Sequence, residues 1–66
     1  MCKYDRDNNG NRWRVDCEKG KWTIWSKGKS DRSFVRMRSN IPSESKAIEK
    51  AESLARKLGL RLKLTK

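Results

Sequence analysis

The sequence predicts a small α+β domain in which a three-stranded antiparallel sheet packs against one C-terminal helix, with a short final strand after it. Apolar residues alternate with polar ones over residues 12–18, 21–26 and 33–38, as they do in half-buried strands. Turn-forming residues separate these runs. Residues 43–58 instead repeat their apolar side chains at helical spacing.

One turn and one loop define the predicted sheet, which spans residues 12–38. A two-residue turn at Lys19-Gly20 brings the apolar residues of the first strand onto the same face as those of the second. The pairs that this turn predicts are Glu18–Lys21, Cys17–Trp22 and Val15–Ile24. After a loop over residues 27–32, the pairs predicted for the third strand are Ile24–Val35, Trp22–Met37 and Trp25–Phe34.

Residues 1–11 are polar and are expected to form a turn or an edge segment. The Asn9-Gly10 dipeptide is a strong hairpin signal. A two-residue turn there predicts a short extra edge strand with the pairs Asn8–Asn11, Tyr4–Val15 and Cys2–Cys17. Part of the segment also matches a calcium-loop spacing, Asp5-x-Asp7-x-Asn9-Gly10 with Asp16 twelfth. Because too few residues precede it to form the entering helix, we expect a turn and no metal.

The predicted helix begins after Ser43, whose hydroxyl can accept from an unpaired backbone N–H of the first turn. Gly59 suits the position just after the helix, where a left-handed residue is common. The apolar stripe between them consists of Ala47, Ile48, Ala51, Leu54, Ala55 and Leu58. Alternation over residues 60–64 predicts a short last strand that returns beside the sheet.

The length and charge of the chain limit what it can do. Its 66 residues are expected to form one small domain, which leaves little room for a deep catalytic cleft. The net charge is +10, of which residues 21–40 carry +5 and residues 41–66 carry +4. A field of this strength favours a polyanionic partner, nucleic acid above all. With no histidine and no apolar pocket to shift the pKa values of its carboxylates, the chain is expected to have no catalytic site.

The sequence also indicates a cellular compartment. No apolar run approaches the length of a signal segment or a membrane span, so a cytoplasmic protein without a membrane partner is expected. Cys2 and Cys17 lack a zinc-type spacing and further soft ligands, and in a reducing cytosol they are expected to be unreacted thiols. No cofactor is predicted.

Strand alternation divides the side chains between two faces of the sheet. The face expected to cover the helix holds Trp13, Val15, Cys17, Trp22, Ile24, Val35 and Met37. Nothing in the chain is left to cover the other face, where Trp25 and Phe34 are expected among cations. An exposed aromatic pair of this kind indicates a binding surface. The residues predicted to bind nucleic acid, two of them from the loop, are Arg12, Arg14, Lys21, Thr23, Trp25, Lys27, Lys29, Phe34, Arg36 and Arg38.

Two short stretches resemble known DNA-binding domains. Gly20-Lys21-Trp22 followed by Ile24 resembles the second strand of plant AP2-type domains, and residues 43–47 resemble the start of their helix. A three-stranded sheet followed by a helix is also the layout of the arm-type DNA-binding domains of phage integrases. The resemblance covers about residues 10–58, and the last strand and the long third strand depart from it. It is as compatible with a free-standing, phage-borne module as with an integrase fragment.

The resemblance implies a sheet laid in the major groove of DNA. In those families arginine and tryptophan side chains of the strands read the bases. The matching residues here are Arg12, Arg14, Trp25, Arg36 and Arg38.

Together these observations predict a non-enzymatic DNA-binding module that uses the basic, uncovered face of its sheet, with phosphate contacts dominating the affinity. Two alternatives stay open. The same face can stack single-stranded RNA or DNA on Trp25 and Phe34. It can instead dock an acidic protein, since tryptophan and arginine are common at the centres of protein interfaces.

Overall fold

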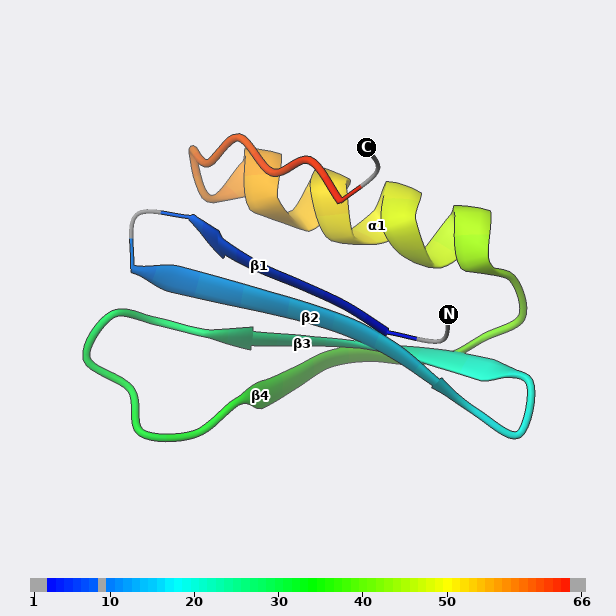
Figure 1. Cartoon of the computed structure of the whole chain (residues 1–66). Coiled ribbons are helices and arrows are strands. Elements are labelled where there is room, and N and C mark those ends of the chain that lie inside the picture. The colour runs from blue at the N-terminus through cyan, green and yellow to red at the C-terminus, as the bar shows by residue number, and fades with distance from the viewer. Residues whose placement is uncertain (1–2, 9, 65–66) are drawn as a thin grey trace.

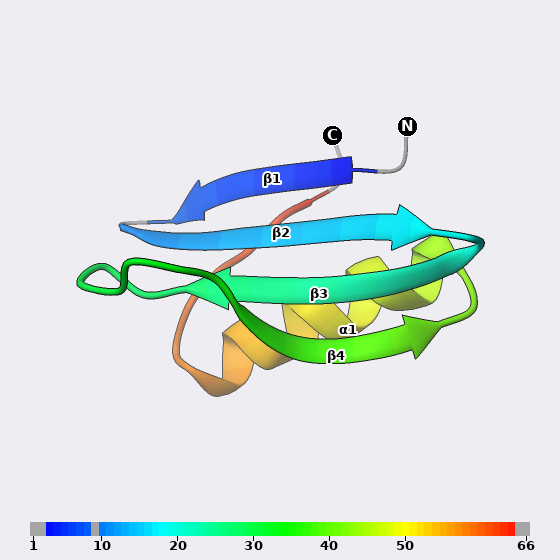
Figure 2. The same cartoon turned by 90° about the horizontal axis from the view of Figure 1, so that it is seen from below.

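The computed structural model describes residues 3–8 and 10–64, which form an α+β fold with one open antiparallel sheet and one helix (Figure 1). The strands lie in the order β1-β2-β3-β4, and the helix crosses one face of the sheet only (Figure 2). The elements are β1 (Lys3–Asn8), β2 (Asn11–Glu18), β3 (Lys21–Lys27), β4 (Val35–Ile41) and α1 (Glu44–Lys57). The sheet therefore has four strands, where the sequence predicted three and a short last one.

The first two hairpins have the predicted registers. Tyr4 lies opposite Val15 across β1 and β2, and Val15 lies opposite Ile24 across β2 and β3. Lys19 and Gly20 have φ angles of 54° and 77°, the pair of positive values that a two-residue hairpin turn of this kind requires. The polar N-terminal segment is thus a full edge strand. The predicted partner of Cys17, Cys2, lies outside the described residues.

The predicted pairing of β4 with β3 is wrong. The observed pairs are Ser26–Val35, Trp25–Arg36, Ile24–Arg38 and Trp22–Ile41. The register shifts twice, once on each side of Ile24, and each shift adds one residue to β4 relative to β3. Because alternate residues of a strand point to opposite faces, each extra residue moves the rest of β4 to the other face.

These shifts change the core as well. Val35 was predicted to be buried, but it is 56% exposed at the start of β4. Ile41 takes the place opposite Trp22 instead and is 4% exposed. Met37, also predicted for the core, packs against its edge and is only partly buried. The buried residues are Trp13, Val15, Trp22, Ile24, Ile41, Ala47, Ile48, Ala51, Ala55, Leu62 and Leu64.

Both ends of α1 are capped as the sequence predicts. The Ser43 hydroxyl accepts a hydrogen bond from the Lys46 backbone N–H at 3.2 Å. At the other end Gly59 has a φ of 79°, and the Leu60 N–H donates to the Ala55 carbonyl at 2.9 Å, which closes a Schellman motif. The helix has 14 residues, and no helix in the described part of the chain is long and apolar enough to cross a membrane.

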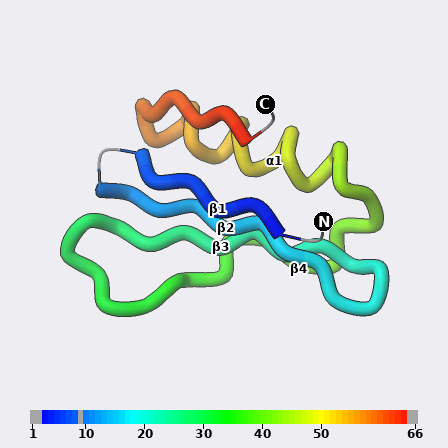
Figure 3. The backbone as a smooth tube through the Cα atoms, in the orientation of Figure 1, coloured from blue at the N-terminus to red at the C-terminus, as the bar shows by residue number. Residues whose placement is uncertain are grey.

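The predicted last strand over residues 60–64 does not form. The segment has no regular secondary structure and runs back beside α1, on the helix side of the sheet (Figure 3). Side chains of β1 hold it, since Asn8 donates to the Arg61 carbonyl at 2.7 Å and Arg6 donates to the Lys63 carbonyl at 3.2 Å. Leu62 and Leu64 are buried. The alternating pattern therefore reflects a segment with one buried side. This segment covers a part of the sheet that α1 does not cover.

The expectation of unreacted thiols is wrong for Cys17, which is disulfide-bonded. Cys2, the other cysteine of the sequence, lies outside the described residues. Cys17 packs against the edge of the core, on the helix-facing side of β2. A disulfide restricts the unfolded chain, so it helps to stabilise a domain that is too small to rely on its core alone.

A hydrogen bond joins β1 to the start of α1. The Tyr4 hydroxyl donates to the Glu44 carboxylate, and this bond, followed by desolvation and the charge of Glu44, raises the pKa of Tyr4 above its ordinary value. The folded state therefore holds the phenol proton more tightly than the unfolded state. The bond stabilises the fold below the ordinary pKa of tyrosine, and this contribution is lost as the pH rises through the raised pKa.

Replacing Glu44 with glutamine should lower the pKa of Tyr4 towards its ordinary value, because the acceptor loses its charge. Tyr4 is the only tyrosine of the chain, so alkaline titration of the tyrosinate absorbance reads it directly. Glu49→Gln is the control, since Glu49 is an exposed carboxylate of the same helix. Unchanged titration curves for Glu44→Gln would show that the bond does not persist in solution.

Candidate nucleic-acid interface

We call the side of the sheet that faces away from α1 the open face (Figure 2). Directly paired residues share a face, so the registers define its membership. It holds Lys3, Asp5 and Asp7 of β1, Arg12, Arg14, Asp16 and Glu18 of β2, Lys21, Thr23, Trp25 and Lys27 of β3, and Arg36 of β4. Eight of the ten residues predicted to bind nucleic acid were expected on this face, and six of them lie here.

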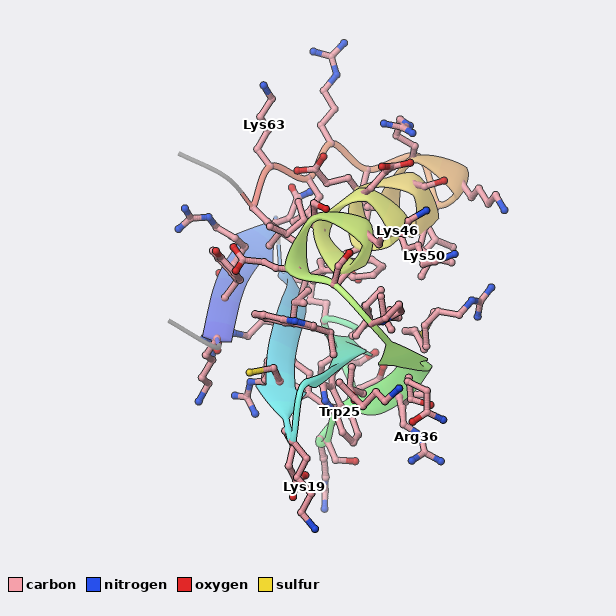
Figure 4. The ribbon with its side chains drawn as sticks, turned by 90° about the vertical axis from the view of Figure 1, so that its right-hand side faces the viewer. Lys19, Trp25, Arg36, Lys46, Lys50 and Lys63 are labelled. Carbon is pink, nitrogen blue, oxygen red and sulfur yellow. The ribbon has the colours of Figure 1, made fainter. Side chains whose placement is uncertain are left out.

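One row of side chains crosses the open face from edge to edge. Asp5 pairs with Arg14, Arg14 with Trp25, and Trp25 with Arg36. The row thus puts one aromatic ring between two arginines on neighbouring strands. Figure 4 shows Trp25 and Arg36 on the side of the sheet away from the helix, with Lys19 projecting from the turn that joins β2 and β3.

Phe34 does not pair with Trp25 as predicted. It precedes β4, in the loop, and its ring lies under the Arg14 guanidinium, whose central carbon is 4.3 Å from the ring centroid. Trp25 is held at its edge, because its indole N–H donates to the Asp16 carboxylate at 3.3 Å. Both aromatic side chains are half-buried. The two rings are therefore fixed by separate polar partners, and the predicted aromatic pair does not form.

Asp5 pairs with the two arginines of β2 and offsets one of their two charges. Its two carboxylate oxygens each lie 3.4 Å from a guanidinium nitrogen, one of Arg12 and one of Arg14. The Arg12 side chain is 50% exposed and that of Arg14 is 32% exposed, so the pairs are partly screened by water. The predicted site contained both arginines but did not include this carboxylate, although the predicted β1–β2 register places Asp5 opposite Arg14.

Charge is divided unequally across the open face. On β1 and β2 the cations Lys3, Arg12 and Arg14 face the carboxylates Asp5, Asp7, Asp16 and Glu18. On β3 and β4 the open face has the cations Lys21, Lys27 and Arg36 and no carboxylate among the described residues. We call this second part the basic half. A polyanion that approaches the open face is therefore attracted more strongly to the basic half than to β1 and β2.

A hollow lies at the end of the basic half, beside the turn between β2 and β3. Its lining consists of Glu18, Lys19, Lys21, Thr23, Arg36, Ser39 and Asn40. Ser39 and Asn40 reach it because the second register shift of β4 falls beside them, and Asn40 has a left-handed φ of 58°. The predicted site did not include Lys19, Ser39 and Asn40. No local pattern reveals the last two, because their position depends on the shift.

The two loop lysines of the predicted site differ in their surroundings. Lys27 donates to the Asp31 carbonyl at 3.2 Å, and Asp31 also closes the turn by accepting from the Gly28 N–H at 2.9 Å. The stem of Lys29 lies so close to Gly10 that a Cβ there would be 2.9 Å from Lys29 Cγ. The loop is therefore folded against the β1–β2 turn, with the Lys29 ammonium at an exposed tip.

Arg38 is not on the open face, which corrects its predicted place. It lies opposite Ile24, after the first register shift, and therefore on the helix-facing side of β4. There it lines a hollow with residues of α1. Trp25 and Arg36 precede the shift and keep the face that alternation predicts for them.

The described residues contain no group of three or more histidine, cysteine, aspartate or glutamate side chains placed to hold a metal ion. Asp7, part of the calcium-like spacing, accepts a hydrogen bond from the Gly10 N–H at 3.2 Å, as a turn residue does. Comparison of the chain with protein-family models, curated protein sequences and solved structures finds no significant match.

Proposed function

We propose that this protein is a non-enzymatic module that binds duplex DNA through the open face of its sheet. The observation that supports this most is the basic half, an uncovered surface where Trp25 and Arg36 lie side by side among lysines and where β3 and β4 themselves contribute no carboxylate. Soluble domains rarely leave such a surface without a partner. A phosphate backbone supplies the negative charge that the surface lacks.

The shape of the sheet suits the major groove. That groove is about 12 Å wide and accepts a two-stranded β-ribbon. With β3 and β4 lowered into it, Arg36 reaches base edges and Trp25 offers an apolar surface to thymine methyl groups. Lys21 and Lys27, at opposite ends of β3 in the basic half, are placed for phosphates. The resemblance of residues 10–58 to arm-type and AP2-type domains points in the same direction.

The fixed aromatic rings favour a duplex over a single strand. Single-strand readers stack bases on freely exposed aromatic faces. Here the Arg14 guanidinium already covers one face of Phe34, and Trp25 is half-buried and bonded to Asp16. Stacking a base on that face of Phe34 requires displacing Arg14, whereas groove binding keeps this contact.

A salt-titrated binding series with duplex DNA, single-stranded DNA and RNA of one sequence tests the proposal. We expect the duplex to bind most tightly and its affinity to fall linearly with salt on logarithmic axes. Tighter binding of either single strand would support the stacking alternative. No binding to any probe, together with a nuclease-resistant acidic partner, would favour the protein-docking alternative and overturn the proposal.

Replacing Asp5 with asparagine should strengthen duplex binding, because the variant releases Arg12 and Arg14 from their carboxylate and removes a negative charge from the open face. The negative slope of log affinity against log salt should become steeper by about 0.9 for each additional phosphate that the released arginines neutralise. Glu49→Gln removes the same charge from the exposed side of α1 and is the matched control. Equally strengthened binding in both variants would mean that net charge alone sets the affinity.

A further inference from the structure

A second cationic surface lies on the flank of the molecule, where β4 meets α1. β4 is the edge strand of the sheet, so its outer side has no neighbouring strand. Arg36 points to the open face, and Arg38, past the first register shift, points to the helix side. The edge of β4 thus carries one arginine on each side.

Arg38 and the helix together form a hollow, which we call the flank pocket. It is lined by Arg38, Lys50, Ser53, Leu54 and Lys57. The three helical polar residues are spaced by three and four positions, so they lie on one side of α1. Figure 4 shows Lys50 on the same side of the molecule as Arg36, with Lys63 on the opposite side.

The flank pocket collects positive charge without compensation. No carboxylate lines it, and the ion pairs found among the described residues involve other cations, Arg12 and Arg14. The Arg38 guanidinium, which belongs to the pocket lining, donates to the carbonyl of its neighbour Met37 at 2.7 Å. Three cations around one hollow repel each other, and a bound phosphate with its several acceptor oxygens removes that repulsion.

The flank pocket adjoins the basic half across the single strand β4. The opposite edge, β1, has Asp5 and Asp7 beside a single cation, Lys3, on its open face, so it attracts phosphates less than β4 does. A duplex seated on the basic half therefore has one of its backbones against β4. The cations on both sides of that strand can then reach phosphates of the same backbone.

We propose that the flank pocket binds phosphates of the DNA strand that borders the groove occupied by the open face, so that β4 follows one backbone with Arg36 on one side and Arg38, Lys50 and Lys57 on the other. This inference rests on the proposed DNA-binding function. It adds a second contact surface and one orientation of the duplex, in which β1 points away from DNA.

The test compares two pairs of neutral variants in the salt-titrated duplex assay. Lys50→Gln with Lys57→Gln removes two flank cations. The negative slope of log affinity against log salt should then become shallower by about 1.8. Arg61→Gln with Lys63→Gln removes the same charge from the exposed C-terminal segment and should leave the slope unchanged. Glutamine is a good helix former, and circular dichroism checks that α1 persists.

Each outcome decides the proposal. A slope unchanged by the Lys50/Lys57 pair, with binding lost in a Trp25→Ala/Arg36→Ala variant, overturns the flank contact and leaves the open face as the DNA site. If the Lys50/Lys57 and Arg61/Lys63 variants make the slope equally shallower, net charge causes the effect. That result also overturns the flank contact. If the unaltered protein binds no duplex, the proposed function fails and the flank contact fails with it.

Discussion

Replacing Trp25 and Arg36 together by alanine should weaken duplex binding about thirty-fold or more. Aromatic and arginine contacts to bases are each worth about 1–3 kcal/mol, and adjacent residues do not add fully, so a joint loss of about 2 kcal/mol is expected. The two residues are direct partners across β3 and β4 and form the centre of the basic half. Fluorescence anisotropy with a labelled duplex measures the loss.

Arg61→Ala is the control for this double variant, because Arg61 is exposed in the C-terminal segment, which lies on the helix side of the sheet. Trp25 is half-buried, so circular dichroism of the double variant must match that of the unaltered protein. The exposed Arg36 can also be replaced alone, without risk to the core. Affinity retained in both Arg36→Ala and the double variant would remove the basic half from the binding surface.

Replacing Trp13 with alanine should cost about 3–5 kcal/mol of the free energy of unfolding, the usual range for a buried tryptophan. Trp13 is completely buried at the centre of β2, between sheet and helix. For a domain of this size the melting temperature should fall by about 15 °C or more, measured by thermal circular dichroism. A small domain has little stability in reserve, so partial unfolding at room temperature is the expected result.

Trp13→Phe separates ring packing from the indole N–H. The Trp13 Nε1 atom is buried and has no hydrogen-bond partner among the described residues. Phenylalanine keeps most of the packing and removes this unpaired donor, whose burial is itself unfavourable. We therefore expect Trp13→Phe to be far more stable than Trp13→Ala. Equal destabilisation by the two substitutions would show that the donor has a partner in solution.

Local signals sufficed to predict the first two hairpins and the helix. The Asn9-Gly10 and Lys19-Gly20 dipeptides predicted the registers as turn signals in the sequence, and alternation then assigned each side chain to a face. Ser43 and Gly59 fixed the ends of the helix through caps that depend on a few adjacent residues. In these places the local preference and the final fold agree.

The position of β4 could not be predicted in the same way. A long loop precedes it, so no tight turn sets its register. The pairing instead follows burial of Ile41 against Trp22, which is reached by adding two residues to β4 along the way. Alternation alone contains no signal for such additions, because it assumes that each strand advances in step. Arg38 was assigned to the wrong face for this reason.

Two other differences between the predicted and the observed structure arise from contacts between distant parts of the chain. Residues 60–64 alternate like a strand, yet they pack over the helix side of β1 and shield the core there. Asp5 lies in a segment that composition alone marks as a polar turn, yet β1 places it against Arg12 and Arg14. Long-range packing decides both positions, and the position of Asp5 lowers the positive charge of the predicted site.

The most direct test of the proposed binding surface is a titration of isotope-labelled protein with a short DNA duplex, followed by backbone amide shifts in nuclear magnetic resonance spectra. We expect the largest shifts in β3 and β4 around Trp25 and Arg36 and at the turn containing Lys19, with small shifts in β1. Shifts confined to the exposed side of α1 or to the C-terminal segment, with β3 and β4 unchanged, would contradict DNA binding by the open face.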